Sequence, residues 1–351
     1  MRIADTGVGS EYLQWFKTRR PARFALSASA VSPCKLSELG ASVQELEING
    51  HGGYGYEPLL EALANHCRVP EACIVSASGT SMANFVAMAA LIEPGDEVLI
   101  EHPVYEPILA AARYLRADIK RMPREADPGD FVSSRTRLIV VTNLHNPTCA
   151  RFDEHQLTAL AETAKNAGAR ILIDEVYLQC LFDQATTAFH LGNVFVATGS
   201  LTKAYGLGGL RCGWILAEPD LCQRMWNMKD LVDPSSVHSK ELLSVIALRN
   251  LNRLAARAKT LIDTNRALLR DFLKTCPQLD VKVPDYGTCV FPRIKNGDGD
   301  RLFDILRNEY DTEVVPGRFF EMPDHFRLGI GMDTAGFVEG LARLKQALER
   351  L

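Results

Sequence analysis

The residues of this chain that could carry covalent chemistry centre on Lys203. A lysine amine can form a Schiff base with an aldehyde when it is fixed on a turn among small residues and hydroxyls. Lys203 stands in such a setting, in the sequence Ser-Leu-Thr-Lys-Ala-Tyr-Gly-Leu-Gly-Gly-Leu-Arg of residues 200–211. Neighbours such as Ser200 and Arg211 could hold a phosphate. Taken alone, the glycines of residues 206–209 could equally form an ordinary connection between a strand and a helix.

Two further segments place polar side chains directly after apolar runs. Asp174 follows residues 171–173, so it should lie at the carboxyl end of a buried strand, where open α/β sheets bind their ligands. A carboxylate there can pair with a protonated pyridine nitrogen, although an Asp after a strand is also a common helix N-cap. Asn146 follows residues 138–141 and precedes Pro147, and Asn-Pro by itself is a turn signal.

A short turn of residues 78–81, Ser-Gly-Thr-Ser, joins the strand-like residues 74–75 to a helical stretch that begins at Met82. The free N–H groups and the positive dipole end of a helix N-terminus favour a bound anion. Serine and threonine before a helix are most often only caps, so this signal is weak alone.

In their order and approximate spacing, these segments resemble those of the class I and II aminotransferases, which are fold type I enzymes that use pyridoxal 5'-phosphate. The resemblance implies that Lys203 carries this cofactor, that Asp174 pairs with its pyridine nitrogen, and that Tyr177 and Asn146 hydrogen-bond its phenolate oxygen. It also implies a set of phosphate-binding residues, namely Gly79, Thr80, Ser81, Ser200 and Arg211. Cys149 stands where the family motif has glycine, which puts the usual left-handed turn in question.

The same resemblance gives roles to three more residues. Tyr105 should stack on the cofactor ring, and Tyr54 should reach the phosphate of a neighbouring subunit, which implies a homodimer with shared active sites. Arg327 follows a Pro-Gly turn and should grip the substrate α-carboxylate through a guanidinium fork. Taken singly, either tyrosine could be ordinary packing, and an arginine in a short strand is usually a solvated edge residue.

The elements that must position these residues alternate along the chain. The strand-like runs are 73–77, 97–100, 138–142, 170–173 and 194–198, and the helical stretches between them include 82–91, 105–115 and 153–167. This pattern predicts an α/β fold with a mostly parallel sheet and helices on both faces. We expect further helices near 58–66, over 243–276 and from 334 onward. The predicted domains are an N-terminal arm with part of the small domain (1–34), a large cofactor domain (35–250) and a C-terminal small domain (251–351).

Composition excludes several classes of protein. The chain has 351 residues, of which 47% are hydrophobic, and its formal charge is 39 minus 43, or -4, so it has no basic excess and nucleic acid is not an expected partner. No apolar run could cross a bilayer and the N-terminus lacks the apolar region of a signal peptide, so we expect a cytoplasmic protein without a membrane partner. Nine cysteines without a Cys-x-x-Cys pair indicate thiols in a reducing compartment, and the eight histidines show no metal-ligand spacing.

The predicted function is transfer of an amino group between an α-amino acid and a 2-keto acid. A lyase or cyclase acting on an amino acid is the alternative, because residues 26–33 lack the Asn-rich motif of histidinol-phosphate aminotransferases and resemble the arm of an outlying subgroup that includes capreomycidine synthase. A nicotinamide-binding fold does not fit, since residues 206–211 lack the third glycine of its fingerprint. A catalytically idle regulatory module is disfavoured, because no helix-turn-helix pattern precedes the cofactor half and every chemical residue is present.

Overall fold

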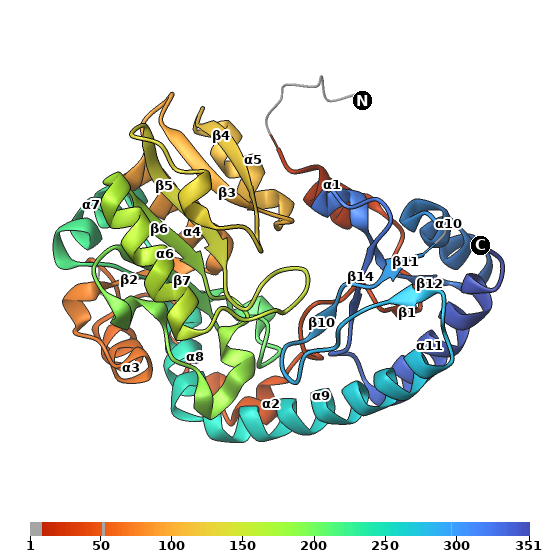
Figure 1. The fold of residues 1–351 in the computed structure, drawn as a ribbon. Helices are drawn as coiled ribbons and strands as arrows, with labels where there is room; N and C mark the ends of the chain where they lie inside the picture. Colours follow the sequence, from red (N-terminus) through yellow and green to blue (C-terminus); the bar gives the residue numbers. More distant parts are fainter. Residues whose placement is uncertain (1–8, 51–52, 296) are drawn as a thin grey trace, which may run out of the picture.

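The computed structural model describes residues 9–50, 53–295 and 297–351, which form two parts of unequal size (Figure 1). The larger part is built on a seven-stranded sheet, and the smaller part holds three short sheets. Helix α9 (Leu251–Lys274) runs along the base of both parts and joins them. The predicted α/β class is confirmed, because the sheet is mostly parallel and its nearest structural relatives share the fold.

The strands of the large sheet lie in the order β2-β8-β7-β6-β5-β3-β4. Only β8 runs against its neighbours. Most of these strands are buried along nearly their whole length, as is typical of a parallel sheet covered on both faces. Their bounds are β2 Ile74–Ser78, β3 Glu97–His102, β4 Asp118–Pro123, β5 Thr136–Thr142, β6 Arg170–Asp174, β7 Phe195–Ser200 and β8 Cys212–Leu216.

Helices cover both faces of this sheet because successive strand side chains point to opposite sides. One core contains Ile139 and Ile171 and packs against α3 (Glu57–Cys67), α6 (Glu154–Ala167) and α8 (His238–Arg249). The other core contains Val140 and Leu172 and packs against α4 (Thr80–Leu91), α5 (Glu106–Tyr114) and α7 (Pro219–Lys229). Short helices complete this part of the chain, namely α2 (Leu36–Leu39), η1 (Val43–Glu45), η2 (Glu71–Cys73), η3 (Pro128–Asp130), η4 (Leu178–Gln184), η5 (Ala188–Leu191) and η6 (Gly208–Leu210).

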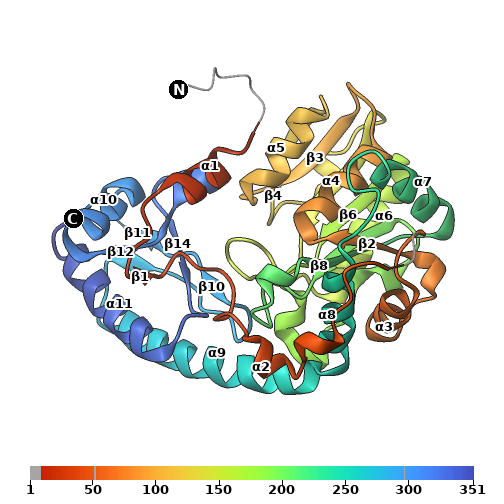
Figure 2. The same ribbon diagram turned by 180° about the vertical axis from the view of Figure 1, so that it is seen from behind.

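The smaller part combines the two ends of the chain. Strand β1 (Phe24–Ala25) pairs in parallel with β12 (Thr312–Glu313), and β14 (Phe326–Gly329) lies between β10 (Cys289–Val290) and β13 (Val315–Pro316). Its remaining elements are β9 (Leu279–Asp280), β11 (Arg293–Ile294), α10 (Gly299–Tyr310), η7 (Gly317–Phe320) and α11 (Thr334–Leu348). Helix α1 (Glu11–Thr18) lies on this part, on the side that faces α5 (Figure 2).

The five expected strands are present with ends shifted by a few residues, but β4 and β8 were not predicted. Strand β4 carries alternating charged residues at the sheet edge, and β8 follows the glycine-rich turn that dominated the interpretation of its region. The prediction of one helix over 243–276 is wrong. The chain breaks at Asn250, which has a φ of -113° and whose side-chain amide donates to the Ile246 carbonyl at 2.8 Å.

The described residues contain no helix with both the length and the apolar character that a membrane span requires.

Candidate active site

The predicted site residues converge on the carboxyl edge of the large sheet. Asp174 and Ser200 are the last residues of β6 and β7, and Asn146 and Tyr105 follow β5 and β3. Residues that are far apart in the sequence meet here because the carboxyl ends of neighbouring parallel strands lie side by side. The smaller part of the molecule faces this edge and contributes Arg327 from β14.

Lys203 lies on the turn after β7 and points toward the N-terminal segment. Its Nζ donates a hydrogen bond to Ser29 Oγ at 3.1 Å and lies 5.9 Å from the ring centre of Tyr177. Burial lowers the pKa of Lys203 to about 8, and the positive charge of Arg327 acts in the same direction. A sizeable fraction of the amine is therefore neutral near neutral pH, which is the form that attacks a carbonyl carbon.

Asp174 is buried and held in one orientation. Its Oδ2 accepts from Asn84 Nδ2 at 2.7 Å, and its Oδ1 accepts from the backbone N–H of Val176 at 2.9 Å. Asn84 is itself fixed, because its Oδ1 accepts from Thr198 Oγ1 at 2.6 Å. Burial raises the pKa of Asp174, while the bonds from Asn84 and Val176 oppose that rise. A cationic partner at the open side of this carboxyl would favour its ionised form.

The turn before α4 forms an anion cradle. Gly79 has a φ of +82°, and a Cβ at this position would lie 2.3 Å from Arg211 Nη2, so only glycine fits. No side chain caps the first turn of α4, and Thr80 Oγ1 is buried without a partner among the described residues. Arg211 Nη2 donates to the Ser78 carbonyl at 3.0 Å, which places a second group of N–H donors at the cradle. Ser81 is exposed, and no contact of its hydroxyl is resolved.

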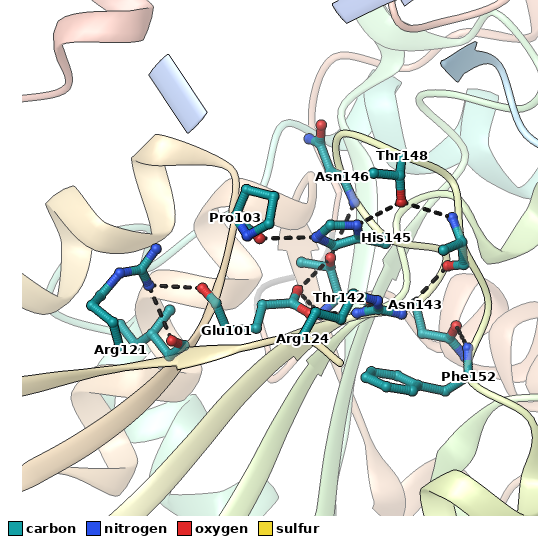
Figure 3. Close-up of polar contacts among 12 residues, drawn as sticks. Glu101, Pro103, Arg121, Arg124, Thr142, Asn143, His145, Asn146, Thr148 and Phe152 are labelled. Carbon is teal, nitrogen blue, oxygen red and sulfur yellow. Dashed lines mark hydrogen bonds and ion pairs between the residues drawn. The ribbon is translucent and has the colours of Figure 1, made fainter. Parts of the chain in front are cut away.

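Asn146 is positioned by its own turn (Figure 3). Its backbone N–H donates to Thr142 Oγ1 at 3.1 Å, and the preceding His145 bonds Thr148 Oγ1 at 2.7 Å and the Pro103 carbonyl at 2.9 Å. Burial keeps the pKa of His145 well below its usual value, so the ring is neutral. The position of the Asn146 side chain is therefore set by a neutral, fully bonded turn.

A buried ion pair supports this turn from below (Figure 3). Glu101 pairs with Arg124 and also accepts from Thr142 through the backbone N–H at 2.5 Å and through Oγ1 at 2.6 Å. Arg124 in turn donates to the Thr142 carbonyl at 3.0 Å and stacks 3.7 Å above the ring of Phe152. Each charge is compensated by several partners, which a pair buried this deeply requires.

Arg327 is buried, with an exposed fraction of only 1%, and is therefore not a solvated edge residue. Its Nη1 donates to Asn146 Oδ1 at 3.0 Å, and its Nη2 donates to the hydroxyl of Tyr12 at 2.9 Å. The Nε–H has no partner among the described residues. The guanidinium thus retains N–H donors for an anion, next to the side chain of Asn146.

The structure places the predicted tyrosines differently from one another. Tyr177 is fully buried beside Lys203, and its hydroxyl has no partner among the described residues. Tyr105 begins α5 at the same edge of the sheet. Tyr54 lies apart from both on an exposed surface, where its hydroxyl donates to Asp230 Oδ2 at 3.2 Å.

Cys149 keeps a left-handed conformation, with a φ of +57°, although the residue is not glycine. Its buried thiol lies 3.4 Å from that of Cys289 on β10, so contacts of the side chain offset the cost of this backbone conformation.

Sequence reasoning missed four residues of the site. Tyr12 and Ser29 come from the N-terminal segment and have no recognisable spacing relative to the motifs. Asn84 offered a signal, because it is a polar residue inside the otherwise apolar helical stretch that follows the phosphate turn. Lys240, whose Nζ lies 3.3 Å from Ser78 Oγ, adds a cation beside the cradle and was hidden within a surface-like helix.

The residues present fit pyridoxal phosphate. Buried polar atoms without partners in the described part of the chain are confined to a few places, and several of them border this site, namely Thr80 Oγ1, Tyr177 OH, Thr202 Oγ1 and Arg327 Nε. Buried groups of this kind normally bond to something, and here a phosphate, a phenolate and a carboxylate would satisfy them. The cradle, the fixed carboxylate and the lysine correspond to the three polar ends of the cofactor.

Comparison with known proteins agrees with this reading of the site. The family model for aminotransferase class I and II matches residues 46–344. Capreomycidine synthase of Streptomyces vinaceus is 28% identical over 95% of this chain and 92% of its own length. A probable aspartate/prephenate aminotransferase of Aquifex aeolicus is 24% identical over 84% of this chain and 81% of its own.

Solved structures share the fold. A PLP-dependent aminotransferase from Streptococcus suis superposes with a TM-score of 0.90 and 24% identity over 100% of this chain and 99% of its own. The PLP-dependent cyclase OrfR superposes with a TM-score of 0.86 and 23% identity over 96% of each chain.

Proposed function

We propose, since this chain belongs to the class I and II aminotransferases and uses pyridoxal 5'-phosphate, that it moves an amino group between an α-amino acid and a 2-keto acid. The observation that carries this proposal is the meeting of Lys203, Asp174 and Arg327 at one sheet edge. A reactive amine, a fixed carboxylate and a buried guanidinium are the groups that an amino acid and this cofactor need together.

The large sheet would hold the cofactor. The phosphate would take the N–H groups at the start of α4, the hydroxyls of Thr80, Ser81 and Ser200, and the guanidinium of Arg211. Tyr177 and the side-chain amide of Asn146 would hold the ring oxygen, and Tyr105 would cover the ring. When bound, the cofactor accepts the electron pair that is left when a bond to the substrate Cα breaks.

The chain's own groups would then direct the reaction. Asp174, held by Asn84 and Val176, keeps its charge on the side where the pyridine nitrogen would lie. Lys203 Nζ, whose pKa of about 8 suits a proton carrier near neutral pH, would take the proton from the substrate Cα and return it. Arg327 would hold the α-carboxylate and so fix which Cα bond faces the lysine.

We further propose that the active unit is a homodimer. Tyr54 lies on a surface that also exposes Ile48, Leu231 and Val237, with exposed fractions of 88%, 77% and 64%. Tyr54 stacks near Trp226 at 5.6 Å, so these two chain segments lie together. Apolar groups gathered in this way support burial by a second copy, and Tyr54 would then reach that copy's phosphate.

The remaining proposals concern domains and location. Separate hydrophobic cores support a division into an N-terminal arm (1–34), a large domain (35–250) and a small domain (251–351). All nine cysteines are free thiols, which supports a reducing compartment such as the cytoplasm.

Elimination or cyclisation of an amino acid is the second candidate. It is favoured by the length of the match to capreomycidine synthase, which covers more of this chain than the match to the Aquifex aeolicus aminotransferase. The same lysine would remove the same Cα proton in both reactions. They differ in whether the proton returns to the cofactor or a group leaves the substrate side chain.

A screen of amino acids, each with and without pyruvate or 2-oxoglutarate, tests both candidates. We expect a new amino acid and a new keto acid to form in equal amounts only when the acceptor is present. A product that forms without an acceptor would instead support the lyase or cyclase. The absence of either outcome for every amino acid would overturn the proposed function.

Lys203→Ala tests the attachment point. We expect borohydride to fix the cofactor covalently to the wild-type chain and not to this variant, as measured by intact mass and by peptide mapping. Lys240→Ala is the matched control, because this second lysine lies beside the cradle and should leave the label on residue 203. Labelling at another lysine would contradict the assignment.

A further inference from the structure

Tyr12 lies inside the site, although no motif pointed to it. It is on the first turn of α1, its side chain is buried, and its hydroxyl accepts a hydrogen bond from Arg327 Nη2 at 2.9 Å. These two residues are 315 positions apart in the sequence. The contact joins the N-terminal helix to the residue assigned to the substrate carboxylate.

Helix α1 is held at both ends so that Tyr12 has a defined position. Before its first turn, Ser10 bonds Glu106 at the start of α5 on the large part. After its last turn, Arg19 Nε donates to Glu313 at 3.0 Å on the small part. The helix therefore spans the two parts, above the site (Figure 2).

The packing around Tyr12 does not account for its hydroxyl. The ring belongs to an apolar cluster with Phe291, Val315, Phe319 and Phe320, and it meets Phe319 edge to face at 5.5 Å. A phenylalanine would fill this space equally well. The hydroxyl is the one atom of the side chain that faces the guanidinium, which points to a polar function.

Hydrogen-bond bookkeeping shows what that function would be. The phenol oxygen accepts from Arg327, so its own proton is free to be donated. Arg327 also retains its Nε–H, because Asn146 and Tyr12 are bonded to its Nη atoms. An anion placed against the guanidinium would thus meet an O–H donor beside the N–H donors.

We propose that Tyr12 is a substrate-binding residue that donates its hydroxyl proton to the α-carboxylate held by Arg327. This inference rests on the proposed function, because it takes the substrate to be an α-amino acid. The Tyr12 ring also meets Tyr105 edge to face at 5.5 Å. The position of the carboxylate is thereby tied to the aromatic ring that covers the cofactor.

The test is Tyr12→Phe, which keeps the ring and removes only the hydroxyl. The probes are α-methylalanine, which has a carboxylate but no α-hydrogen, and tert-butylamine, which has a methyl group in place of that carboxylate. Binding is measured by titrating the absorbance of the cofactor-loaded protein, so that no turnover is needed. Tyr114→Phe is the control, because Tyr114 is an exposed tyrosine on α5.

We expect Tyr12→Phe to raise the Kd of α-methylalanine by roughly 10- to 100-fold, the range for a lost hydrogen bond to a charged group. The Kd values of tert-butylamine and of pyridoxal phosphate should not change, and Tyr114→Phe should match the wild type. An unchanged Kd for α-methylalanine, or equal losses for both probes, would overturn the role of Tyr12 alone. A wild-type protein that binds no cofactor or no α-methylalanine would instead overturn the proposed function.

Discussion

The two sides of the candidate site are built in different ways. The cofactor side consists of residues at the ends of neighbouring strands of one sheet, such as Asp174 on β6 and Ser200 on β7. The substrate side is assembled from α1, the segment around Ser29, and β14, which come from opposite ends of the chain. One side is fixed by backbone hydrogen bonds within a sheet, and the other depends on how side chains meet across a gap.

This difference separates two kinds of rigidity. Asp174 and Asn146 lie on elements whose neighbours are buried on both faces, and each is held by further hydrogen bonds from the same part of the molecule. Arg327 is held by Asn146 on one part and by Tyr12 on α1. A change on the cofactor side should therefore affect every substrate alike, whereas a change on the substrate side should affect only substrates with the matching group.

Asp174→Asn should have the largest effect and is the sharpest test of the cofactor side. The amide keeps the shape of the side chain but cannot hold a pyridinium charge, so we expect the cofactor to stay bound while kcat falls by about three orders of magnitude or more. The loss should be the same for all amino acids, as measured by single-turnover kinetics.

The matched control for this variant is Glu175→Gln at the adjacent position. Burial raises the pKa of Glu175 to about 8, so its carboxyl is mostly protonated at neutral pH, and it accepts a bond from the backbone of Ala188. Replacing it with a neutral amide should change kcat only slightly. Similar losses in both variants would mean that packing, and not the charge of residue 174, supports catalysis.

The cofactor side was also the part that the sequence could predict. Strand periodicity places Asp174 and Asn146 at strand ends, and parallel topology then brings them together. Tyr12 could not be found in this way, because nothing in its local sequence specifies a partner 315 residues later. Strand β8 and the break at Asn250 were missed for a related reason, since strand pairing and the local competition of an Asn side chain are tertiary and rotamer effects.

Arg327→Ala should have the next largest effect and tests the substrate side. If its guanidinium holds the α-carboxylate, kcat/KM for an amino acid should fall by roughly 2 to 5 kcal/mol. The affinity for pyridoxal phosphate should not change, as measured by equilibrium dialysis.

An amine without the carboxylate supplies the control for this prediction. It should be a poor substrate for the wild type and should lose little more in the variant. Arg327→Lys keeps a charge in the buried site and guards against a simple loss of folding. Equal losses for the amino acid and the amine would erase the distinction between the two sides of the site.

Tyr54→Phe should have the smallest effect, and it asks whether the cofactor side is complete within one chain. The variant keeps the aromatic contact with Trp226 and loses the hydroxyl, so we expect the affinity for pyridoxal phosphate to fall by about tenfold. A mixed dimer of Tyr54→Phe and Lys203→Ala chains decides which subunit is served. Its one site with an intact Lys203 would receive Tyr54 from the other chain, so that site should bind the cofactor with wild-type affinity. Weakened binding in the mixed dimer would place Tyr54 in the site of its own chain, and a fully active monomer in sedimentation would remove the shared site altogether.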